Sequence, residues 1–473
     1  MHTLYDKIRK SVVLMLIISM LFCGCTTYKD INKSDMEKEN NAALDYKYDE
    51  QTYQKSVGSR AAFTDEGFIF LVNGMLYYYD MTDNEAVPMC SDMTCDHNDS
   101  DCKAYALDKK NYDPYDLSGV SVNCLGNMVW YENKHIYMIK REESGDYLME
   151  YDAQFNNEKK VVCLANNGSI VGMPSADTEN AAIVYDNYIY YYSVKPTKAN
   201  ELVSQDYNTT VTCKRAALDG SSEAEELGSF LIAIDYSIFP TGSYGKLCIG
   251  NDCIYYVAGG TTRFMSKDNP VQYRICRYNI KTSSFEQLIN VNSQQKEDIL
   301  GTGTGNVQPV NNDIVTADNN DSLYIVTDNN RIIKMSSDGE VEEIYHNENA
   351  ECIMSLRSQN EKLYFYEKIP NGGNIKLLNQ NYEVVGTFSL EKDKSISLGE
   401  YGISDVYIYG VDNNNIYIRL NDNNVLNMKN ENIEGFNQKH SEAGINTYSV
   451  YLIEIGGNNS GDNELTKIYN WHK

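Results

Sequence analysis

The stretch of residues 323–342, LYIVTDNNRIIKMSSDGEVE, decides the predicted fold, because six other segments of the chain repeat its pattern with different residues. It predicts two short strands, LYIVT and RIIKM, joined by an Asn/Asp turn at residues 328–330. A second turn, at residues 337–339, precedes a third strand over residues 341–345. Apolar residues alternate with polar or aromatic ones, which indicates a sheet with at least one buried face. Such a unit cannot bury its own apolar face, so we expect the repeats to pack against one another.

An apolar residue followed by an aromatic one marks each repeat, as Leu323-Tyr324 does here. The other six pairs are Ile69-Phe70, Ile136-Tyr137, Ile189-Tyr190, Ile254-Tyr255, Leu363-Tyr364 and Ile416-Tyr417. The seven units are spaced from 40 to 69 residues apart. This spacing lies in the upper part of the range expected for four-stranded propeller blades with loop insertions.

The sequence around each marker predicts one strand before it and two strands after it. The first strands are predicted at residues 128–131, 182–185, 247–249, 314–315, 353–356 and 406–409. The third are predicted at 75–79, 147–151, 211–217, 273–278, 331–335 and 375–378, and the fourth at 87–90, 160–164, 223–227, 285–289, 341–345 and 384–388. For the last unit we prefer residues 448–455 and 465–469, with 420–446 inserted, over a strand at 425–428.

These strands predict an all-β fold, a seven-bladed β-propeller of four-stranded antiparallel blades over residues 59–473. Two closures of the ring are open. A strand from residues 59–65 could complete the first unit, or the segment 448–470 could exchange with it.

The N-terminus predicts export. Lys7, Arg9 and Lys10 precede the uncharged run SVVLMLIISMLF at residues 11–22, which is too short to span a bilayer and is typical of a secretory signal. The following Leu-Phe-Cys-Gly-Cys at residues 21–25 resembles the lipobox of bacterial lipoproteins. This resemblance implies that residues 1–24 are a signal peptide and that Cys25 carries the lipid. Phe22 departs from the usual Leu, and an ordinary secretory signal is the alternative.

Residues 25–58 begin with Cys25 and are mostly polar, which predicts a disordered, flexible tether between the membrane and the propeller. The chain carries a formal charge of −26, and removal of residues 1–24 takes away three basic residues and one acidic residue, leaving about −28. Such a surface repels phosphate, so we expect no nucleic-acid partner. The predicted location is the outer face of the cytoplasmic membrane, with the lipid on Cys25 as anchor.

Several motifs resemble a known family. The run TCKRAALDG at residues 212–220 is similar to a strand and turn of the YWTD-type propeller repeat, and residues 323–328 are similar to its LYWTD strand. Over residues 60–470 the chain resembles Firmicute lipoproteins with a DUF5050 domain, which are described as low-density-lipoprotein-receptor-related-protein-like β-propellers. The marks are the lipobox, the run YYYD at 77–80 and a Cys/His segment after the first unit. Trp is missing from every YWTD position, and the resemblance implies a fold and an envelope location rather than an activity.

The densest group of chemically active side chains is Cys90, Cys95, His97 and Cys102. Three thiols and one imidazole could form a tetrahedral zinc site that holds the long connection after the first unit. A disulfide between two of the three cysteines is equally compatible with an exported chain, and free thiols are the third possibility. In each case we expect a structural role.

The other cysteines predict little chemistry. Cys248 and Cys253 flank the turn at residues 250–252, so they could form a disulfide across a hairpin. Five more lie on or beside separate strands and are interpreted as small buried hydrophobes: Cys124, Cys163, Cys213, Cys276 and Cys352. The motifs of zinc proteases, serine hydrolases and Walker loops are absent from the sequence, and we assign no catalytic residue.

Two abundant residue classes have structural explanations. The 39 tyrosines are typical of strands, where the ring packs and the hydroxyl reaches water, so we favour core packing over ligand stacking. The Asn/Asp runs at 318–321, 412–415 and 421–424 are interpreted as turns. The preferred function is a membrane-anchored binding module for an unidentified protein or glycan ligand. The alternatives are a carbohydrate hydrolase or lyase that uses carboxylates at the channel mouth, and a structural component of an envelope assembly.

Overall fold

The computed structural model describes residues of the second of two units of the chain, Tyr48–Lys473. The described residues are 61–64, 66–72, 75–83, 85–97, 102–106, 128–142, 144–172, 181–194, 208–233, 243–260, 272–290, 315–327, 330–359, 361–370, 372–391, 406–411, 415–421, 448–454 and 465–469. Among these residues, no helix is long and apolar enough to cross a membrane.

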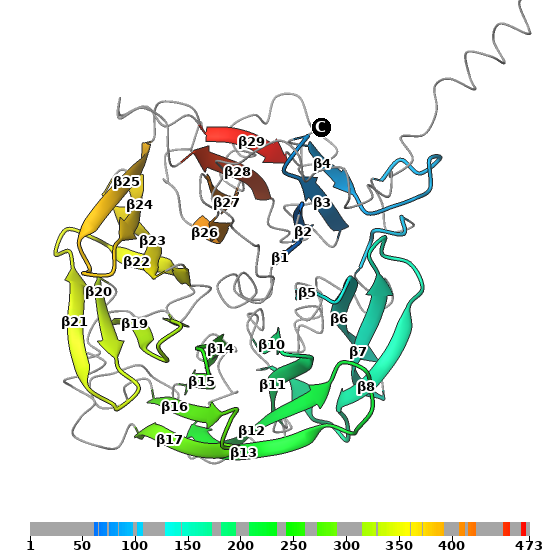
Figure 1. Ribbon diagram of the computed structural model, residues 1–473, viewed down its shortest axis with the longest axis horizontal. Helices are drawn as coiled ribbons and strands as arrows, with labels where there is room; N and C mark the ends of the chain where they lie inside the picture. The colour runs from blue at the N-terminus through cyan, green and yellow to red at the C-terminus, as the bar shows by residue number, and fades with distance from the viewer. Residues whose placement is uncertain are drawn as a thin grey trace, which may run out of the picture. The chain divides into compact units, whose positions relative to one another are not determined.

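The predicted seven-bladed β-propeller is confirmed. Seven sheets, each of four consecutive antiparallel strands, form a ring with the first strands toward its centre (Figure 1). The first three blades comprise β1 (Ala61–Phe63), β2 (Gly67–Val72), β3 (Met75–Asp80), β4 (Glu85–Pro88); β5 (Val129–Glu132), β6 (His135–Glu142), β7 (Gly145–Asp152), β8 (Lys159–Ala165); and β10 (Ala182–Tyr185), β11 (Tyr188–Val194), β12 (Asn208–Ala217), β13 (Glu225–Ala233). The third blade also includes β9 (Ile170–Val171), which pairs with the end of β11.

The other four blades follow the same order. They comprise β14 (Ser243–Ile249), β15 (Cys253–Gly260), β16 (Gln272–Asn279), β17 (Ser284–Asn290); β18 (Val315–Ala317), β19 (Leu323–Thr327), β20 (Arg331–Met335), β21 (Val341–His346); β22 (Cys352–Gln359), β23 (Lys362–Ile369), β24 (Gly372–Leu378), β25 (Val384–Glu391); and β26 (Val406–Val411), β27 (Asn415–Asn421), β28 (Tyr448–Glu454), β29 (Leu465–Tyr469). The preferred strands of the last unit are therefore confirmed.

Burial decreases from the centre of the ring to its rim. All five residues of β19 are buried, whereas in β21 four of six are exposed and none is buried. This gradient explains the sequence pattern, because inner strands are covered on both sides by neighbouring blades and read as nearly continuous apolar runs. Of the twelve largest fully buried side chains among the described residues, eleven are tyrosines. The interpretation of tyrosine as a core residue is confirmed for these positions.

Among the residues that the structure describes, no strand is shared between the first and last blades at the ring closure. Strand β1 pairs with β2 in the first blade, while β28 and β29 both belong to the seventh, so the first of the two predicted closures is the one observed. Side chains make the junction instead. The Phe68 ring lies 5.0 Å from the Tyr417 ring, and the Phe70 ring lies 6.1 Å from the Tyr409 ring.

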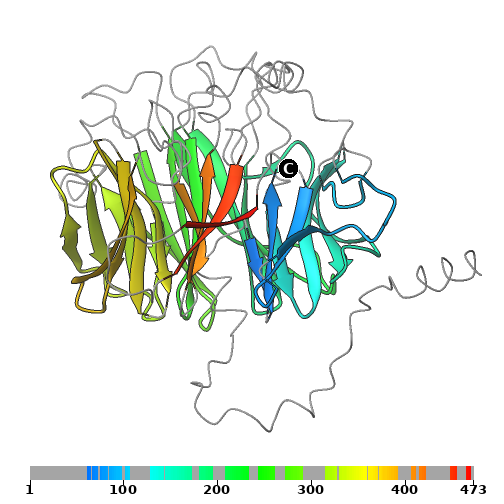
Figure 2. The ribbon, with the colours of Figure 1, turned by 90° about the horizontal axis from the view of Figure 1, so that it is seen from above.

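The strand order divides the connections between two faces of the ring, between which the strands run (Figure 2). The turns that join first to second and third to fourth strands lie on one side, which we name the turn face. The connections between second and third strands and between blades lie on the other, which we name the loop face. The Cys/His segment follows a fourth strand and therefore begins at the loop face.

Candidate functional site

The described residues of the Cys/His segment, 89–97 and 102–106, extend the edge of the first blade. Strand β4 is only four residues long and pairs with the last four residues of β3, from Tyr77 onward. The remaining edge of β3 is paired by the segment itself. Leu76 accepts a hydrogen bond from the backbone N–H of Met89 (3.0 Å) and donates one to the carbonyl of Ala104 (2.9 Å), and Tyr105 forms a bridge with Met75.

The four side chains predicted from the sequence converge within this segment. The Sγ atoms of Cys90, Cys95 and Cys102 and a ring nitrogen of His97 all lie within 4.8 Å of one another. The Nδ1 atom of His97 is 3.5 Å from the Sγ atom of Cys102. Their spacing in the sequence is irregular, but turns of the backbone bring them together.

Two local features explain this convergence. Asp92 caps a tight turn, because its carboxylate accepts a hydrogen bond from the backbone N–H of Thr94 and its carbonyl accepts one from that of Cys95. His97 adopts the left-handed conformation, with φ of 53°, and its N–H donates to the Sγ atom of Cys95 at 3.4 Å. The backbone therefore reverses twice within eight residues and returns the imidazole to the thiols.

The thiols of this cluster are free and differ in environment. Burial raises the pKa of Cys102 to about 12, although a hydrogen bond from the backbone of Ala104 acts in the other direction. Burial also acts to raise the pKa of Cys90, but hydrogen bonds, chiefly from the backbones of Asp92 and Lys103, lower it overall. The cluster therefore provides four soft or borderline donors at distances that suit a metal ion.

The segment also packs against the two core clusters that the first blade shares with its neighbours, the seventh and the second blades. Cys102 and Ala104 are buried in the core cluster that contains Phe70 and Tyr409 at the ring closure. Met89 contacts both this cluster and the neighbouring one, which contains Val129 of the second blade. The loop is thus part of the folded propeller rather than an appendage.

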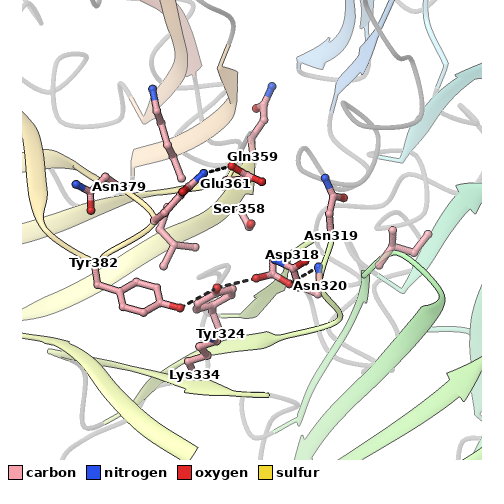
Figure 3. Close-up of a pocket in the computed structure, with 15 residues that line it drawn as sticks. Asp318, Asn319, Asn320, Tyr324, Lys334, Ser358, Gln359, Glu361, Asn379 and Tyr382 are labelled. Carbon is pink, nitrogen blue, oxygen red and sulfur yellow. Dashed lines mark hydrogen bonds between the residues drawn. The ribbon is translucent and has the colours of Figure 1, made fainter. Parts of the chain in front are cut away.

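A second candidate site is a pocket of about 260 Å³ on the turn face (Figure 3). It lies mainly between the fifth and sixth blades. Its walls come from the β18–β19 turn at Asp318–Asn320, the β22–β23 turn at Glu361 and the β24–β25 turn at Asn379–Tyr382, while Ile249, Ala317 and Leu363 provide its apolar part. Turns from two blades therefore converge on one hollow.

A hydrogen-bonded chain of side chains fixes one wall of the pocket. The Oδ1 atom of Asp318 accepts hydrogen bonds from the backbone N–H groups of Asn320 and Ser322, as expected for an Asx turn. Its Oδ2 atom accepts the hydroxyl of Tyr324 at 2.8 Å. The hydroxyl of Tyr324 lies 3.5 Å from that of Tyr382, and the two rings meet edge to face at 62° (Figure 3).

The pocket is lined by equal numbers of acidic and basic side chains. Asp318 and Glu361 line it together with Lys334 and Lys362. The ammonium group of Lys334 lies 5.3 Å from the centre of the Tyr382 ring, and the Tyr382 hydroxyl raises the pKa of this lysine. Burial raises the pKa of Tyr324, so this phenol stays protonated and can donate a hydrogen bond at neutral pH. The pocket therefore presents many neutral donors and acceptors and no excess of either charge.

The other predicted site residues have varied outcomes. Cys25 and Cys124 lie outside the described residues. Cys248 and Cys253 are free thiols in the structure, where the register places Cys248 opposite Tyr255 and Cys253 beyond the last paired residue of β14. The hairpin disulfide stays a prediction. The two thiols are diagonal neighbours rather than partners across the hairpin.

The pocket could be identified from the sequence only in part. The Asn/Asp run at residues 318–321 predicts a turn, which the structure confirms, but nothing in the run itself indicates that this turn forms the wall of a pocket. The pocket depends on which blades are neighbours and how their turns tilt. A concentration of amide side chains on several turns, including Asn379-Gln380-Asn381, was the available signal.

Comparison with known proteins finds remote similarity to solved structures. No family model matches the chain, and no curated protein does. Among solved structures, the β-propeller domain of the Trilobed protease from Pyrococcus furiosus is similar over 88% of this chain and 97% of that one, with 10% identity and a TM-score of 0.40. An uncharacterized protein from Listeria monocytogenes is similar over 72% and 81%, with 10% identity and a TM-score of 0.38.

A prolyl endopeptidase structure is also similar, with 10% identity and a TM-score of 0.43. The similarity covers 88% of this chain and 51% of the endopeptidase chain, so this chain spans about half the length of that structure.

Proposed function

We propose that the protein is a lipid-anchored extracytoplasmic lipoprotein whose β-propeller binds an uncharged glycan in the turn-face pocket. We also propose, from the resemblance to DUF5050 lipoproteins, that the protein belongs to that family and lies on the outer face of the cytoplasmic membrane. The proposal also includes a structural metal ion at Cys90, Cys95, His97 and Cys102. The observation that carries the binding function is the lining of the pocket between the fifth and sixth blades.

The lining supports a polyhydroxylated ligand. Carboxamide side chains of Asn319, Asn320 and Gln380, together with the hydroxyl of Tyr382, line the pocket. Amides and phenols both donate and accept hydrogen bonds, which matches sugar hydroxyls that do the same. Two acids and two lysines line the pocket as well, so a strongly charged ligand would gain little net attraction.

The position of the pocket supports a rigid binding site. Its polar turns are held by internal hydrogen bonds, such as that from the backbone N–H of Asn381 to Oδ1 of Asn379 at 2.9 Å. A preformed wall loses little conformational entropy when a ligand binds. At about 260 Å³ the pocket suits one or two sugar rings rather than a long polymer.

Binding to immobilised oligosaccharides tests this function directly. The mature chain would be titrated with neutral and N-acetylated envelope oligosaccharides, and uncharged peptides would form a second panel. Asn319→Ala combined with Asn320→Ala removes two exposed amides from the wall, and we expect affinity for a glycan to fall about tenfold or more. Asn381→Ala, an exposed amide on the same turn as Tyr382 but outside the lining, is the matched control.

The outcomes separate the candidates. Glycan binding that is lost in the double variant and kept in the control supports the proposal. Binding only to peptides, or glycan binding that the double variant retains, overturns it. Release of shortened oligosaccharide would instead favour the hydrolase or lyase alternative.

Membrane anchoring has its own test. A labelled fatty acid should be incorporated into the wild-type chain and not into Cys25→Ala, which should also leave the membrane fraction. Cys23→Ala, two residues away, is the matched control and should remain lipidated. Equal labelling of wild type and Cys25→Ala would overturn the assignment of the lipobox.

A further inference from the structure

We infer that Cys90, Cys95, His97 and Cys102 bind one zinc ion, and that this ion completes the outer edge of the first blade. The inference concerns a different part of the molecule from the glycan pocket. It identifies the metal of the proposed structural centre, its coordination and the piece of the fold that depends on it.

The geometry of the four donors fits zinc. Zinc–sulfur bonds of about 2.3 Å and zinc–nitrogen bonds of about 2.0 Å in a tetrahedron place sulfur and nitrogen about 3.5 Å apart, and two sulfurs about 3.8 Å apart. The observed separation of Nδ1 of His97 and Sγ of Cys102 is 3.5 Å. All other pairs lie within 4.8 Å, so a central ion requires shifts of about 1 Å or less.

The donor set also distinguishes zinc from other ions. Three thiolates and one imidazole are the ligands of structural zinc sites, whereas calcium and magnesium require oxygen ligands. All four tetrahedral positions are filled by the protein. A site without an open position binds no water or substrate, so its role is structural.

A disulfide explains the arrangement less well. It would join two of the three sulfurs and leave the third thiol and the imidazole without a shared function. The backbone turn at His97 has positive φ, a conformation that costs free energy for a residue other than glycine. This cost is accounted for when the imidazole is a ligand, since zinc binding releases far more free energy than the turn requires.

The segment that the ion would hold takes the place of a longer fourth strand in the first blade. Beyond the four residues of β4, the edge of β3 is paired by residues on both sides of the cluster, Met89 before it and Ala104 and Tyr105 after it. No regular element connects these two pairing points among the described residues between them. A metal ion bound to side chains near both pairing points would therefore hold this part of the chain in register along the outer edge of the first blade.

Metal analysis of the intact mature chain, purified without reductant or chelator, tests the inference. We expect about one equivalent of zinc per chain, falling below about a tenth in Cys95→Ser and in His97→Ala. Cys163→Ser is the matched control, because Cys163 is another half-buried free thiol, on β8, and should leave the zinc content unchanged. Cobalt substituted for zinc should give the absorption of a tetrahedral thiolate complex.

A local measurement tests the structural role even if the variants are less stable. Hydrogen exchange of the Leu76 amide, which donates to Ala104, should accelerate when zinc is removed from the wild-type chain by a chelator, while that of Ile333 in the fifth blade should not. If the chain contains no metal and has two fewer reactive thiols than the fully reduced chain, the cluster forms a disulfide and the inference is overturned. Zinc content unaffected by both substitutions would do the same. These readouts are independent of glycan binding, so either proposal can fail alone.

Discussion

The ring of Phe68 in the first blade lies 5.0 Å from the ring of Tyr417 in the seventh, in an edge-to-face arrangement at 61°. The same tyrosine lies 6.1 Å from Phe63 and 6.0 Å from Tyr79. No described strand is shared across this junction, so packing of aromatic side chains joins the first blade to the seventh, whereas backbone hydrogen bonds join the strands within each blade.

Replacing Phe68 by Ala should therefore destabilise the protein strongly. The side chain is fully buried, and truncation of a buried Phe costs about 3–5 kcal/mol. Urea unfolding followed by tryptophan fluorescence measures the change. Val341→Ala, at a position 36% exposed on an outer strand, is the control and should change the free energy of unfolding by less than about 0.5 kcal/mol. Similar values for the two variants would show that the junction contributes little.

The buried ion pair between Arg141 and Asp146 predicts a second large effect. Nε of Arg141 donates to Oδ1 of Asp146 at 2.7 Å, and Oδ2 also accepts the backbone N–H of Val171 at 2.6 Å, which attaches β9 to the second blade. Asp146→Ala should cost about 3–5 kcal/mol, because it leaves a largely buried guanidinium group without its partner.

The control for this ion pair is Glu142→Ala, which breaks the more exposed pair with Lys160 and should destabilise the protein much less, because solvent screens exposed charges. Thermal unfolding of both variants gives the comparison. A loss at Asp146 no greater than that at Glu142 would contradict the prediction.

The contact between the fourth and fifth blades predicts that Gly250 tolerates no side chain. A Cβ atom there would collide with Oδ1 of Asp321 and lie 3.2 Å from its Cα atom. That carboxylate oxygen accepts the backbone N–H of Asp252 at 3.0 Å, so a shift of Asp321 also breaks a bond between blades. Gly250→Ala should lower the unfolding temperature by several degrees. Gly386→Ala, where the nearest contacts are an ordinary 3.4 Å, should have a much smaller effect.

Alkaline pH should destabilise the protein through buried tyrosines, of which Tyr190 is the most testable. Burial raises its pKa to about 12, from an ordinary value of 10.0. The unfolded chain therefore releases this proton at lower pH than the folded chain does. The stabilisation from Tyr190 is complete below about pH 10 and is lost as the pH rises toward about 12.

The substitution Tyr190→Phe removes this titration. Between pH 9 and about 11.5, the free energy of unfolding of the variant should fall less steeply than that of the wild type, when both are measured by urea unfolding. Equal slopes would show that Tyr190 titrates alike in both states.

Much of the fold could be predicted because propeller strands carry local information. Residues 323–327 and 331–335 are short, apolar-rich runs that end at turn residues, so strand positions and their order follow from the sequence, and β19 and β20 have the predicted bounds. The predicted strands differ from the observed ones mainly at their first and last residues. The fourth strand of the third blade was predicted at 223–227, whereas β13 extends over Glu225–Ala233, because β12 is ten residues long and provides partners for the additional residues.

The sites could be predicted less completely. The Cys/His cluster was identified because its four side chains are close in sequence, but its connection to Leu76 depends on the shortness of β4. The pocket arises from turns of different blades and leaves no local pattern. The distance between Cys248 and Cys253 depends on the register of their hairpin, which composition does not determine.

The consecutive strand order has a consequence for how the chain is made. A protein is synthesised from its N-terminus, and the described strands of each blade come from one continuous segment of the chain, so each blade can form as soon as its own segment has emerged. Among the described strands, none of the first blade pairs with a strand of the last. Ring closure is then the docking of the folded seventh blade against the folded first blade. A chain interrupted before the seventh blade would leave the Phe68 ring without Tyr417, and this exposed aromatic surface would favour aggregation or recognition by quality control.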